Sequence, residues 1–398
     1  MKIERIETFR IEQFPLLLWV RVFTDDGLIG VGETFYGPET AESAVHELLA
    51  PLLIGRDPAH TEPLWSDMFR LVDHFGYGGA ELRGISALDT ALWDIAGKAA
   101  GKPVFELLGG ASRDRIKVYN TYGGADYEKD PVPFAQELLD AGIDVIKVNA
   151  FPAAHRGDGL ELTPRQLDEI IRPIDLLATG LGGRMRIAVD GHGFWGLHQA
   201  MEIARALEGY PIYWIEELMS PRAPGALEQL RRVTNHPICL SERFITRFGF
   251  TEFLDRNLVD VAMPDLVWTG GISETRRIAI LAESRQVHIA PHDSTGPVNM
   301  FACAHICMNA PNAMIMESSR TFYERPQETV WDPYPGLGLT SGWYWEIVEE
   351  PAVIQDGYLL APREPGLGVR LRDDLDRRPD FHTRVSTERL PHHIRWER

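Results

Sequence analysis

Six ionisable residues recur at a nearly constant spacing in the middle of the chain, and their side chains could perform acid–base chemistry around a metal ion. They are Asp190, Glu216, Glu242, Asp265, His292 and Glu317. Successive positions differ by 26, 26, 23, 27 and 25 residues, which suits one strand followed by one helix at each step. The spacing therefore predicts that six consecutive strands each place one ionisable group at the same edge.

The first three of these residues, Asp190, Glu216 and Glu242, are all acids. Three carboxylates held close together repel one another unless a cation binds them. Hard oxygen ligands that leave coordination positions open favour Mg²⁺. A single acid is more often a surface residue or a helix cap, but three in register on consecutive strands predict a magnesium site.

Asp265 and His292 form a second candidate group. A carboxylate that binds one ring nitrogen of a histidine fixes its tautomer and raises its basicity. A lone histidine at the end of a strand more often serves packing. The combination with Asp265 makes His292 a candidate general base.

These residues need a scaffold that repeats, and the central part of the chain alternates short apolar segments with helix-like ones. The expected strands are 117–122, 145–148, 187–190, 213–216, 238–242, 259–264, 288–291 and 313–317. Eight strands that alternate with helices indicate an α/β fold, a modified (β/α)₈ TIM-type barrel. Active sites of such barrels lie at the carboxyl ends of the strands, where the ionisable residues occur.

The remaining segments have different patterns. Strand-like segments 3–9 and 17–23 precede helix-like ones, an order typical of a small α+β domain. We expect a capping domain at 1–112, a catalytic barrel at 113–330, and a C-terminal segment at 331–398 that packs back on the capping domain and completes it.

Composition restricts the partners. The 58 acidic and 40 basic residues give a formal net charge of −18, which argues against nucleic acid. No segment is long and apolar enough to span a membrane, and no secretory signal precedes the domain, so we expect a cytoplasmic protein. Cys303 and Cys307 flank His305, but their spacing favours an inward-facing helix over a metal site.

Three motifs resemble the mandelate racemase branch of the enolase superfamily. They are ISALDTALWDIAGKAAGKPVFELLGG at 85–110, Asp190-Gly191-His192, and WIEEL at 214–218. The resemblance extends over essentially the whole chain. One departure is Leu218, where the family usually has proline; we expect an altered loop there and an intact site.

The resemblance implies roles for the recurring residues. By it, Asp190, Glu216 and Glu242 are Mg²⁺ ligands, Asp265–His292 is the dyad, and Glu317 hydrogen-bonds the carboxylate or enediolate of the substrate. It also implies an assembly of identical subunits that acts on a small carboxylate.

The second strand narrows the resemblance. It carries Lys147-Val148-Asn149, which lacks the second lysine that serves as a base in racemases. His192 then makes the chain similar to D-galactonate dehydratase-like acid-sugar dehydratases. In that mechanism Lys147 and Mg²⁺ hold the substrate carboxylate, His292 removes the α-proton, and His192 protonates the departing β-hydroxyl. The product is a 2-keto-3-deoxy acid.

Substrate contacts and two alternatives stay open. Candidate substrate-binding residues are Asn149, Tyr122, His74 and Arg83. A racemase, epimerase or cycloisomerase would use the same metal and the same first step. A metal-dependent hydrolase is disfavoured because residues 120–122 offer no His-x-His pair, and a non-catalytic barrel is disfavoured because every ligand and dyad position is filled.

Overall fold

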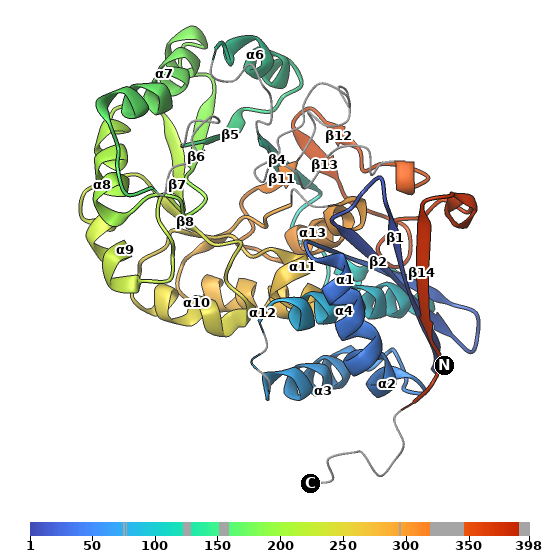
Figure 1. Ribbon diagram of the computed structural model, residues 1–398. Coiled ribbons are helices and arrows are strands. Elements are labelled where there is room, and N and C mark those ends of the chain that lie inside the picture. Colours follow the sequence, from blue (N-terminus) through green and yellow to red (C-terminus); the bar gives the residue numbers. More distant parts are fainter. Residues whose placement is uncertain are drawn as a thin grey trace.

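The structure is a computed structural model that describes residues 1–74, 76, 78–121, 129–150, 159–293, 296–318 and 346–389. Within these residues two sheets organise the chain (Figure 1). One sheet is antiparallel and belongs to the first domain. The other is mainly parallel and forms the barrel. No helix among the described residues is both long and apolar enough to cross a membrane.

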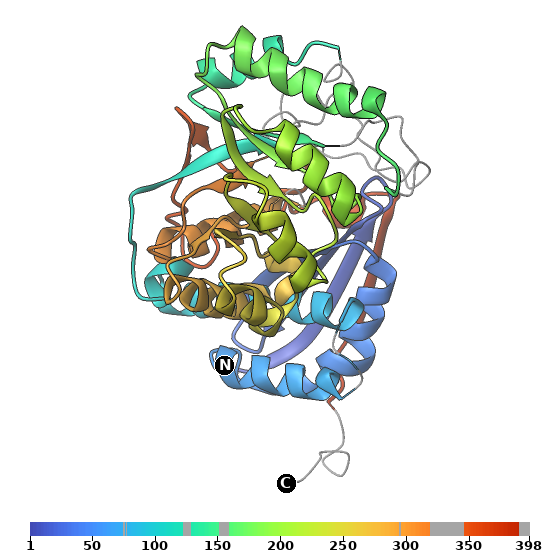
Figure 2. The same cartoon turned by 90° about the vertical axis from the view of Figure 1, so that its left-hand side faces the viewer.

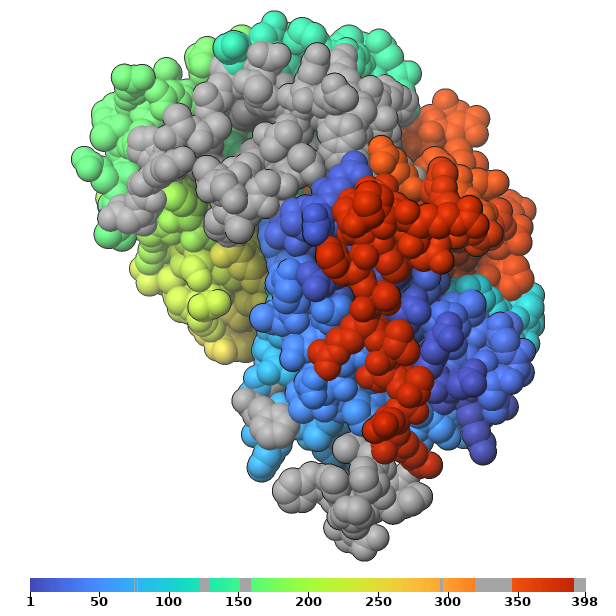
Figure 3. All heavy atoms as spheres, turned by 45° about the vertical axis from the view of Figure 1, so that its right-hand side comes forward, coloured from blue at the N-terminus to red at the C-terminus, as the bar shows by residue number. Residues whose placement is uncertain are grey.

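The antiparallel sheet joins the two ends of the chain. Its strands are β1 (Ile3–Ile11), β2 (Leu17–Thr24), β3 (Ile29–Phe35) and β14 (Phe381–Ser386), in the order β14-β1-β2-β3. In Figure 2 the red C-terminal strand runs beside the blue strands, and in Figure 3 the red segment lies across the first domain. The C-terminal tail thus completes the capping domain, as predicted.

Helices cover this sheet on one side. They are α1 (Pro38–Ala44), the π-helix η1 (Val45–Leu49), α2 (Ala50–Leu53), α3 (Thr61–Asp73) and α4 (Ala80–Ala100). Helix α4 packs directly on β3, where Gly30 and Gly32 make the close approach possible. A Cβ atom at these positions would lie 2.1 Å from Ala91 O and 1.8 Å from Ala87 O.

The parallel strands form the predicted barrel. They are β4 (Arg115–Thr121), β5 (Val145–Asn149), β6 (Arg186–Asp190), β7 (Ile212–Glu216), β8 (Ile238–Leu240), β9 (Val261–Ala262), β10 (His288–Ile289) and β11 (Met316–Ser318). Strands β4 to β10 pair in chain order, β11 pairs with β4, and a bridge between Ile289 and Ala313 closes the ring. Each predicted strand overlaps one observed strand.

Helices follow the strands on the outside of the barrel (Figure 1). They are α6 (Val132–Asp140), α7 (Pro164–Gly180), α8 (Leu197–Ala206), α9 (Pro224–Arg231), α10 (Thr246–Asp255), α11 (Leu266–Thr269), α12 (Gly271–Glu283) and α13 (Pro297–Asn309), and the short helix α5 (Val104–Leu107) precedes β4. Helix α13 is buried almost all round, including Cys303 and Cys307. His305 accepts a hydrogen bond from Phe105 N at 3.2 Å, so this cluster serves packing.

The described part of the tail contacts both domains. Strands β12 (Ile354–Gln355) and β13 (Tyr358–Leu360) form a hairpin, and β13 pairs with β4 of the barrel. Asp356 and Gly357 form the turn, with φ of 50° and 76°. After the 3₁₀-helix η3 (Leu375–Arg377), β14 pairs with β1.

Buried polar contacts join the first domain to the barrel. Trp65 Nε1 donates to Gly270 O at 2.7 Å, and Asp89 accepts from Ser273 Oγ at 2.6 Å. Glu33 on β3 accepts from the backbone amides of Val298 and Asn299 at 3.3 and 3.1 Å. Glu33 therefore caps the first turn of α13 from the other domain.

The variant Glu33→Ala is expected to lower the free energy of unfolding by about 1–3 kcal/mol, because two buried amides lose their acceptor. Burial raises the pKa of Glu33 from 4.5 to about 7. A carboxyl group whose pKa is higher in the folded protein stabilises the fold fully at pH values below its unfolded pKa. That stability is lost as the pH rises through the folded pKa, so Glu33→Ala should lower the free energy of unfolding more at pH 5 than at pH 8.

Thermal and urea unfolding at pH 5 and pH 8 would measure this loss of stability. Glu4→Ala, at an exposed position of β1, serves as the control. Equal midpoints for the two variants would contradict the capping role.

Candidate active site

The predicted metal ligands lie together at the carboxyl ends of adjacent strands. Asp190 ends β6 and pairs in register with Glu216, which ends β7. Glu216 pairs with Cys239 on β8, and Glu242 follows that strand. Asp190 and Glu216 are almost completely buried. The barrel thus places three acids next to one another in a region shielded from water.

Lys147 on β5 is the cation at the centre of this group. Its Nζ lies 3.1 Å from Glu317, 3.2 Å from Glu216 and 3.7 Å from Asp190. Burial acts to lower the pKa of Lys147, but the carboxylates outweigh it and hold that pKa well above its usual value. Lys147 is therefore a fixed positive charge in the site.

The acids differ in their pKa values. Burial raises the pKa of Asp190 to about 6, and negative Glu242 adds to the effect. Burial and negative Asp190 raise that of Glu216 to about 8. Burial acts to raise the pKa of Glu242 as well, but positive His292 outweighs it, so this pKa lies below its usual value. The three acids and Glu317 outnumber Lys147 and His292, the two cations that contact them, so a further cation would stabilise the group.

The donor set fits a hard divalent cation by its chemistry. All three groups are carboxylates, and Asp190 Oδ2 is buried and accepts no hydrogen bond within the described residues, with His192 Nε2 3.1 Å away. Their present directions differ, since Glu216 contacts Lys147 and Glu242 contacts His292. No group of three His, Cys, Asp or Glu side chains in the described ranges surrounds a common point. Mutual repulsion explains why uncompensated carboxylates turn to these cations instead.

Asp265 and His292 form the predicted pair. Asp265 caps α11 by accepting from Val267 N at 2.9 Å, which fixes its carboxylate. His292 Nδ1 lies 2.6 Å from Asp265 Oδ2. The opposite nitrogen, Nε2, lies 3.0 Å from Glu242 and 3.7 Å from Glu317. Burial acts to lower the pKa of His292, but Glu242, Glu317 and Asp265 outweigh it and hold that pKa well above its usual value. The imidazole is thus oriented with Nε2 toward the carboxylates, and it can act as a base once Glu242 turns from it to a bound cation.

Glu317 on β11 connects the base to the lysine. It accepts hydrogen bonds from the Thr121 hydroxyl and from Asp293 N, the latter at 3.0 Å. Burial acts to raise the pKa of Glu317, but positive Lys147 and His292 outweigh it and lower this pKa to about 2. Glu317 is a fixed anion that orients its neighbours.

His192 follows β6 and contacts the carboxylate group from another side. Its backbone N donates to Asp190 Oδ1 at 2.8 Å, and its Nε2 lies 3.1 Å from Asp190 Oδ2. Strands β6 and β10 are four positions apart in the closed ring of eight described strands. His192 and His292 therefore approach the centre of the barrel mouth from opposite sides.

Among the predicted substrate-binding residues, Arg83 lies near the dyad. Its Nε donates to Phe35 O at 3.0 Å, and its guanidinium lies 5.3 Å from the centre of the Trp268 ring. That ring is 5.6 Å from the ring of His292. Arg83 of the first domain and His292 of the barrel thus both lie against the ring of Trp268.

The other three candidates have different positions. Asn149 ends β5 in register with Asp190. His74 is exposed at the end of α3, where the structure does not place it with the carboxylates. Tyr122 lies outside the described residues.

Sequence reasoning overlooked two charged residues beside the ligands. Glu217 follows Glu216 and is buried, and Arg243 follows Glu242 and contacts Glu217 at 3.1 Å. The doubled acid in WIEEL was the available signal. Glu216 is the last residue of β7, and Glu217 leaves the strand with φ of 35°.

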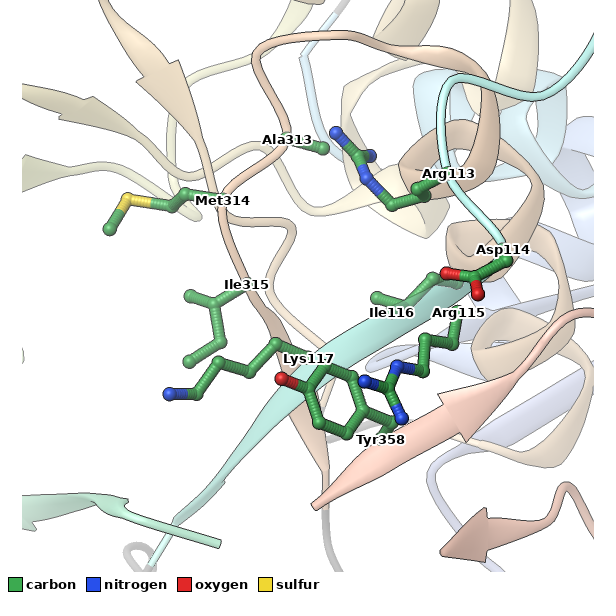
Figure 4. A pocket seen from close by; sticks show the side chains of 9 residues that line it. All are labelled: Arg113, Asp114, Arg115, Ile116, Lys117, Ala313, Met314, Ile315 and Tyr358. Atoms are coloured by element: carbon green, nitrogen blue, oxygen red, sulfur yellow. The ribbon is translucent and has the colours of Figure 1, made fainter. Parts of the chain in front are cut away.

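A cavity of about 200 Å³ lies elsewhere (Figure 4). It opens at the amino-terminal end of β4, and Arg115, Lys117, Ile315 and Tyr358 line part of it. Lys117 is paired there with Asp144 at 2.6 Å. Barrel enzymes work at the opposite strand ends, so this cavity is distinct from the candidate active site.

Two protein families match the sequence. Residues 10–109 match the mandelate racemase/muconate lactonizing enzyme N-terminal domain, and residues 132–375 match the enolase C-terminal domain-like family. A solved enolase of the mandelate racemase subgroup from Agrobacterium tumefaciens superposes with a TM-score of 0.86 at 37% identity, covering 97% of this chain and 99% of that one.

Curated relatives are similar over most of their length. A D-galactonate dehydratase of Variovorax paradoxus is 35% identical, with 94% of this chain and 93% of the relative covered. A D-xylonate dehydratase of Haloferax volcanii is 30% identical, with 94% and 87% covered.

Proposed function

Since the chain belongs to the mandelate racemase branch of the enolase superfamily, we propose that it is a carbon–oxygen lyase that dehydrates a sugar acid to a 2-keto-3-deoxy acid. The observation that carries this proposal is the placement of two histidines on opposite sides of one carboxylate-lined site. Dehydration needs a base at the α-carbon and an acid at the β-hydroxyl. Relatives named as dehydratases of D-galactonate and D-xylonate support it.

Each of four residues has a distinct role in this reaction. Lys147 binds the substrate carboxylate, which increases the acidity of the adjacent C–H bond. His292, oriented by Asp265 at 2.6 Å, takes the α-proton on Nε2. His192 gives a proton to the β-hydroxyl as the C–O bond breaks, and Glu317 holds Lys147 in place at 3.1 Å.

The reaction balances without any oxidant. The C2–H and C3–O bonds break, water leaves, and the resulting enol gains a proton at C3 as it becomes the 2-keto acid. The enol can acquire that proton from solvent, so the product made in D₂O should carry deuterium at C3.

The family generally depends on Mg²⁺, and Asp190, Glu216 and Glu242 are the residues that would hold it here. When bound, the ion would stabilise the negative charge that develops on the substrate during proton removal. The raised pKa values of Asp190 and Glu216 and the buried Asp190 Oδ2 support this assignment.

Racemisation or epimerisation is the second candidate, because two histidines on opposite sides could add and remove the same proton. Asn149 stands where a racemase would have its second lysine base. The names of the relatives favour loss of water over change of configuration.

A substrate panel tests the proposal. The purified protein with Mg²⁺ would be incubated with aldonic and aldaric acids, including D-galactonate and D-xylonate, and 2-keto acid would be detected with semicarbazide. Product from one or a few acids is expected. A blank panel from folded protein that binds Mg²⁺ would contradict the proposed dehydration.

The variant His192→Asn is expected to separate the two steps. Dehydration should fall by about 10²–10⁴-fold, the usual contribution of a general acid. Exchange of the α-proton with D₂O, followed by NMR, should persist because His292 is intact. Equal loss of both would mean that His192 does not act at the β-hydroxyl.

A further inference from the structure

The loop that carries His192 has an unfavourable backbone. His192 has φ of 47° and the next residue, Gly193, has φ of 66°. A residue with a Cβ atom rarely adopts this left-handed conformation, so contacts around the loop must hold it. Such contacts decide where the imidazole points.

Glu217 and Arg243 supply several of these contacts. Gly193 N donates to Glu217 O at 2.6 Å, and the guanidinium of Arg243 donates to His192 O. The same guanidinium lies against Gly193, where a Cβ atom would be 2.9 Å from Nη1. Arg243 therefore binds the backbone carbonyl of His192 and occupies the space beside Gly193.

The Glu217 carboxylate anchors Arg243. It lies 3.1 Å from Arg243 Nε and accepts a hydrogen bond from the Ser241 hydroxyl. Only 2% of the Glu217 side chain is exposed, against 39% for Arg243. A buried carboxylate needs a charged or hydrogen-bonding partner, so the buried Glu217 fixes the position of the more exposed Arg243.

These contacts link three adjacent strands. The His192 loop follows β6, Glu217 follows β7, and Arg243 comes shortly after β8. Glu217 and Arg243 each directly follow one of the proposed metal ligands, Glu216 and Glu242. A shift at the end of any one of these three strands would therefore move His192.

We propose that Arg243, anchored by Glu217, is a positioning residue that holds the His192 loop so that the imidazole reaches the β-hydroxyl of the substrate. The kinetic part of this inference rests on the proposed dehydration. Arg243 acts through the backbone carbonyl of His192 and touches neither the dyad nor Lys147 in the described contacts. Its loss should impair protonation of the leaving group and spare removal of the α-proton.

The test compares Arg243→Ala, Arg243→Lys and Glu217→Gln with the wild type, and uses Arg232→Ala as a matched control. Arg232 is exposed just after α9 and pairs with Glu228 of that helix, outside the site. Each protein is assayed for dehydration and for α-proton exchange in D₂O. Amide hydrogen exchange is measured for a peptide that covers residues 191–196.

For Arg243→Ala we expect dehydration to fall by about 10–100-fold, the effect of a small misplacement of a catalytic group, with α-proton exchange within about threefold of wild type. The ammonium group of lysine lacks the planar set of donors with which arginine binds the His192 carbonyl and the Glu217 carboxylate together. Arg243→Lys should therefore restore activity only in part. Arg243→Ala should add nothing to the defect of His192→Asn, since both act at one step.

Amide exchange in 191–196 should become at least about tenfold faster in Arg243→Ala and Glu217→Gln, because local opening follows loss of these contacts. Unchanged exchange there would overturn the positioning role whatever the substrate is. Parallel loss of dehydration and α-proton exchange would also overturn it. Failure of the wild type to dehydrate any acid, with exchange in 191–196 accelerated as expected, would refute the proposed function and leave the loop contact established.

Discussion

The variant His292→Asn is expected to lose both α-proton exchange and dehydration, by about 10²–10⁴-fold, because it removes the general base that starts the reaction. Asparagine can still accept a hydrogen bond but cannot take up a proton near neutral pH. Asp265 holds His292 Nδ1 at 2.6 Å, so Nε2 is the only ring nitrogen left to act on the substrate. NMR in D₂O with the best acid of the panel measures both steps at once.

His288→Asn provides a matched control for this variant. His288 begins the same strand, β10, but is exposed at its other end. Its replacement should leave both rates close to wild type. Retention of α-proton exchange in His292→Asn would show that another residue removes the proton, with His192 as the first alternative to examine.

Removal of divalent metal with EDTA is expected to abolish both steps, and added Mg²⁺ should restore them. Polarisation of a substrate by a metal supplies several kcal/mol, which corresponds to at least about 10³-fold in rate. Asp190→Asn should produce the same loss, because an amide is neutral and offers a divalent cation only one oxygen.

A second readout does not depend on turnover. Mg²⁺ that binds the folded protein should raise its thermal unfolding midpoint in a concentration-dependent manner, and Asp190→Asn should weaken that rise. Glu252→Gln, on the exposed side of α10, serves as the control. Full activity after exhaustive chelation would contradict the metal assignment.

The sequence predicted the elements whose patterns are local. Apolar segments followed by charged residues located every barrel strand, and the regular spacing from Asp190 to Glu317 identified residues that the fold brings to one end of the barrel. Helix α13 was predicted only through the spacing of Cys303 and Cys307, and its bounds were not, because it is buried nearly all round and lacks a polar face. Helix periodicity is visible only where one side of a helix meets water.

Contacts between distant segments were beyond sequence reasoning. Nothing in the spacing of Arg243 indicates that its guanidinium reaches the backbone of His192, 51 residues earlier. The same holds for Glu33, which caps α13 across the domain junction. His74 was chosen from a glycine-rich loop and is exposed at the end of α3, and its contact with a substrate stays a prediction.

One site is expected to remove an α-proton and then to eliminate the β-hydroxyl. The most direct test is a single incubation in D₂O with Mg²⁺ and the acid that the panel identifies, analysed by NMR and mass spectrometry. We predict a 2-keto-3-deoxy acid that has lost one water and carries deuterium at C3. An acid that exchanges its α-proton, or inverts at C2, while it retains the oxygen at C3 would contradict the claim and identify a racemase or epimerase.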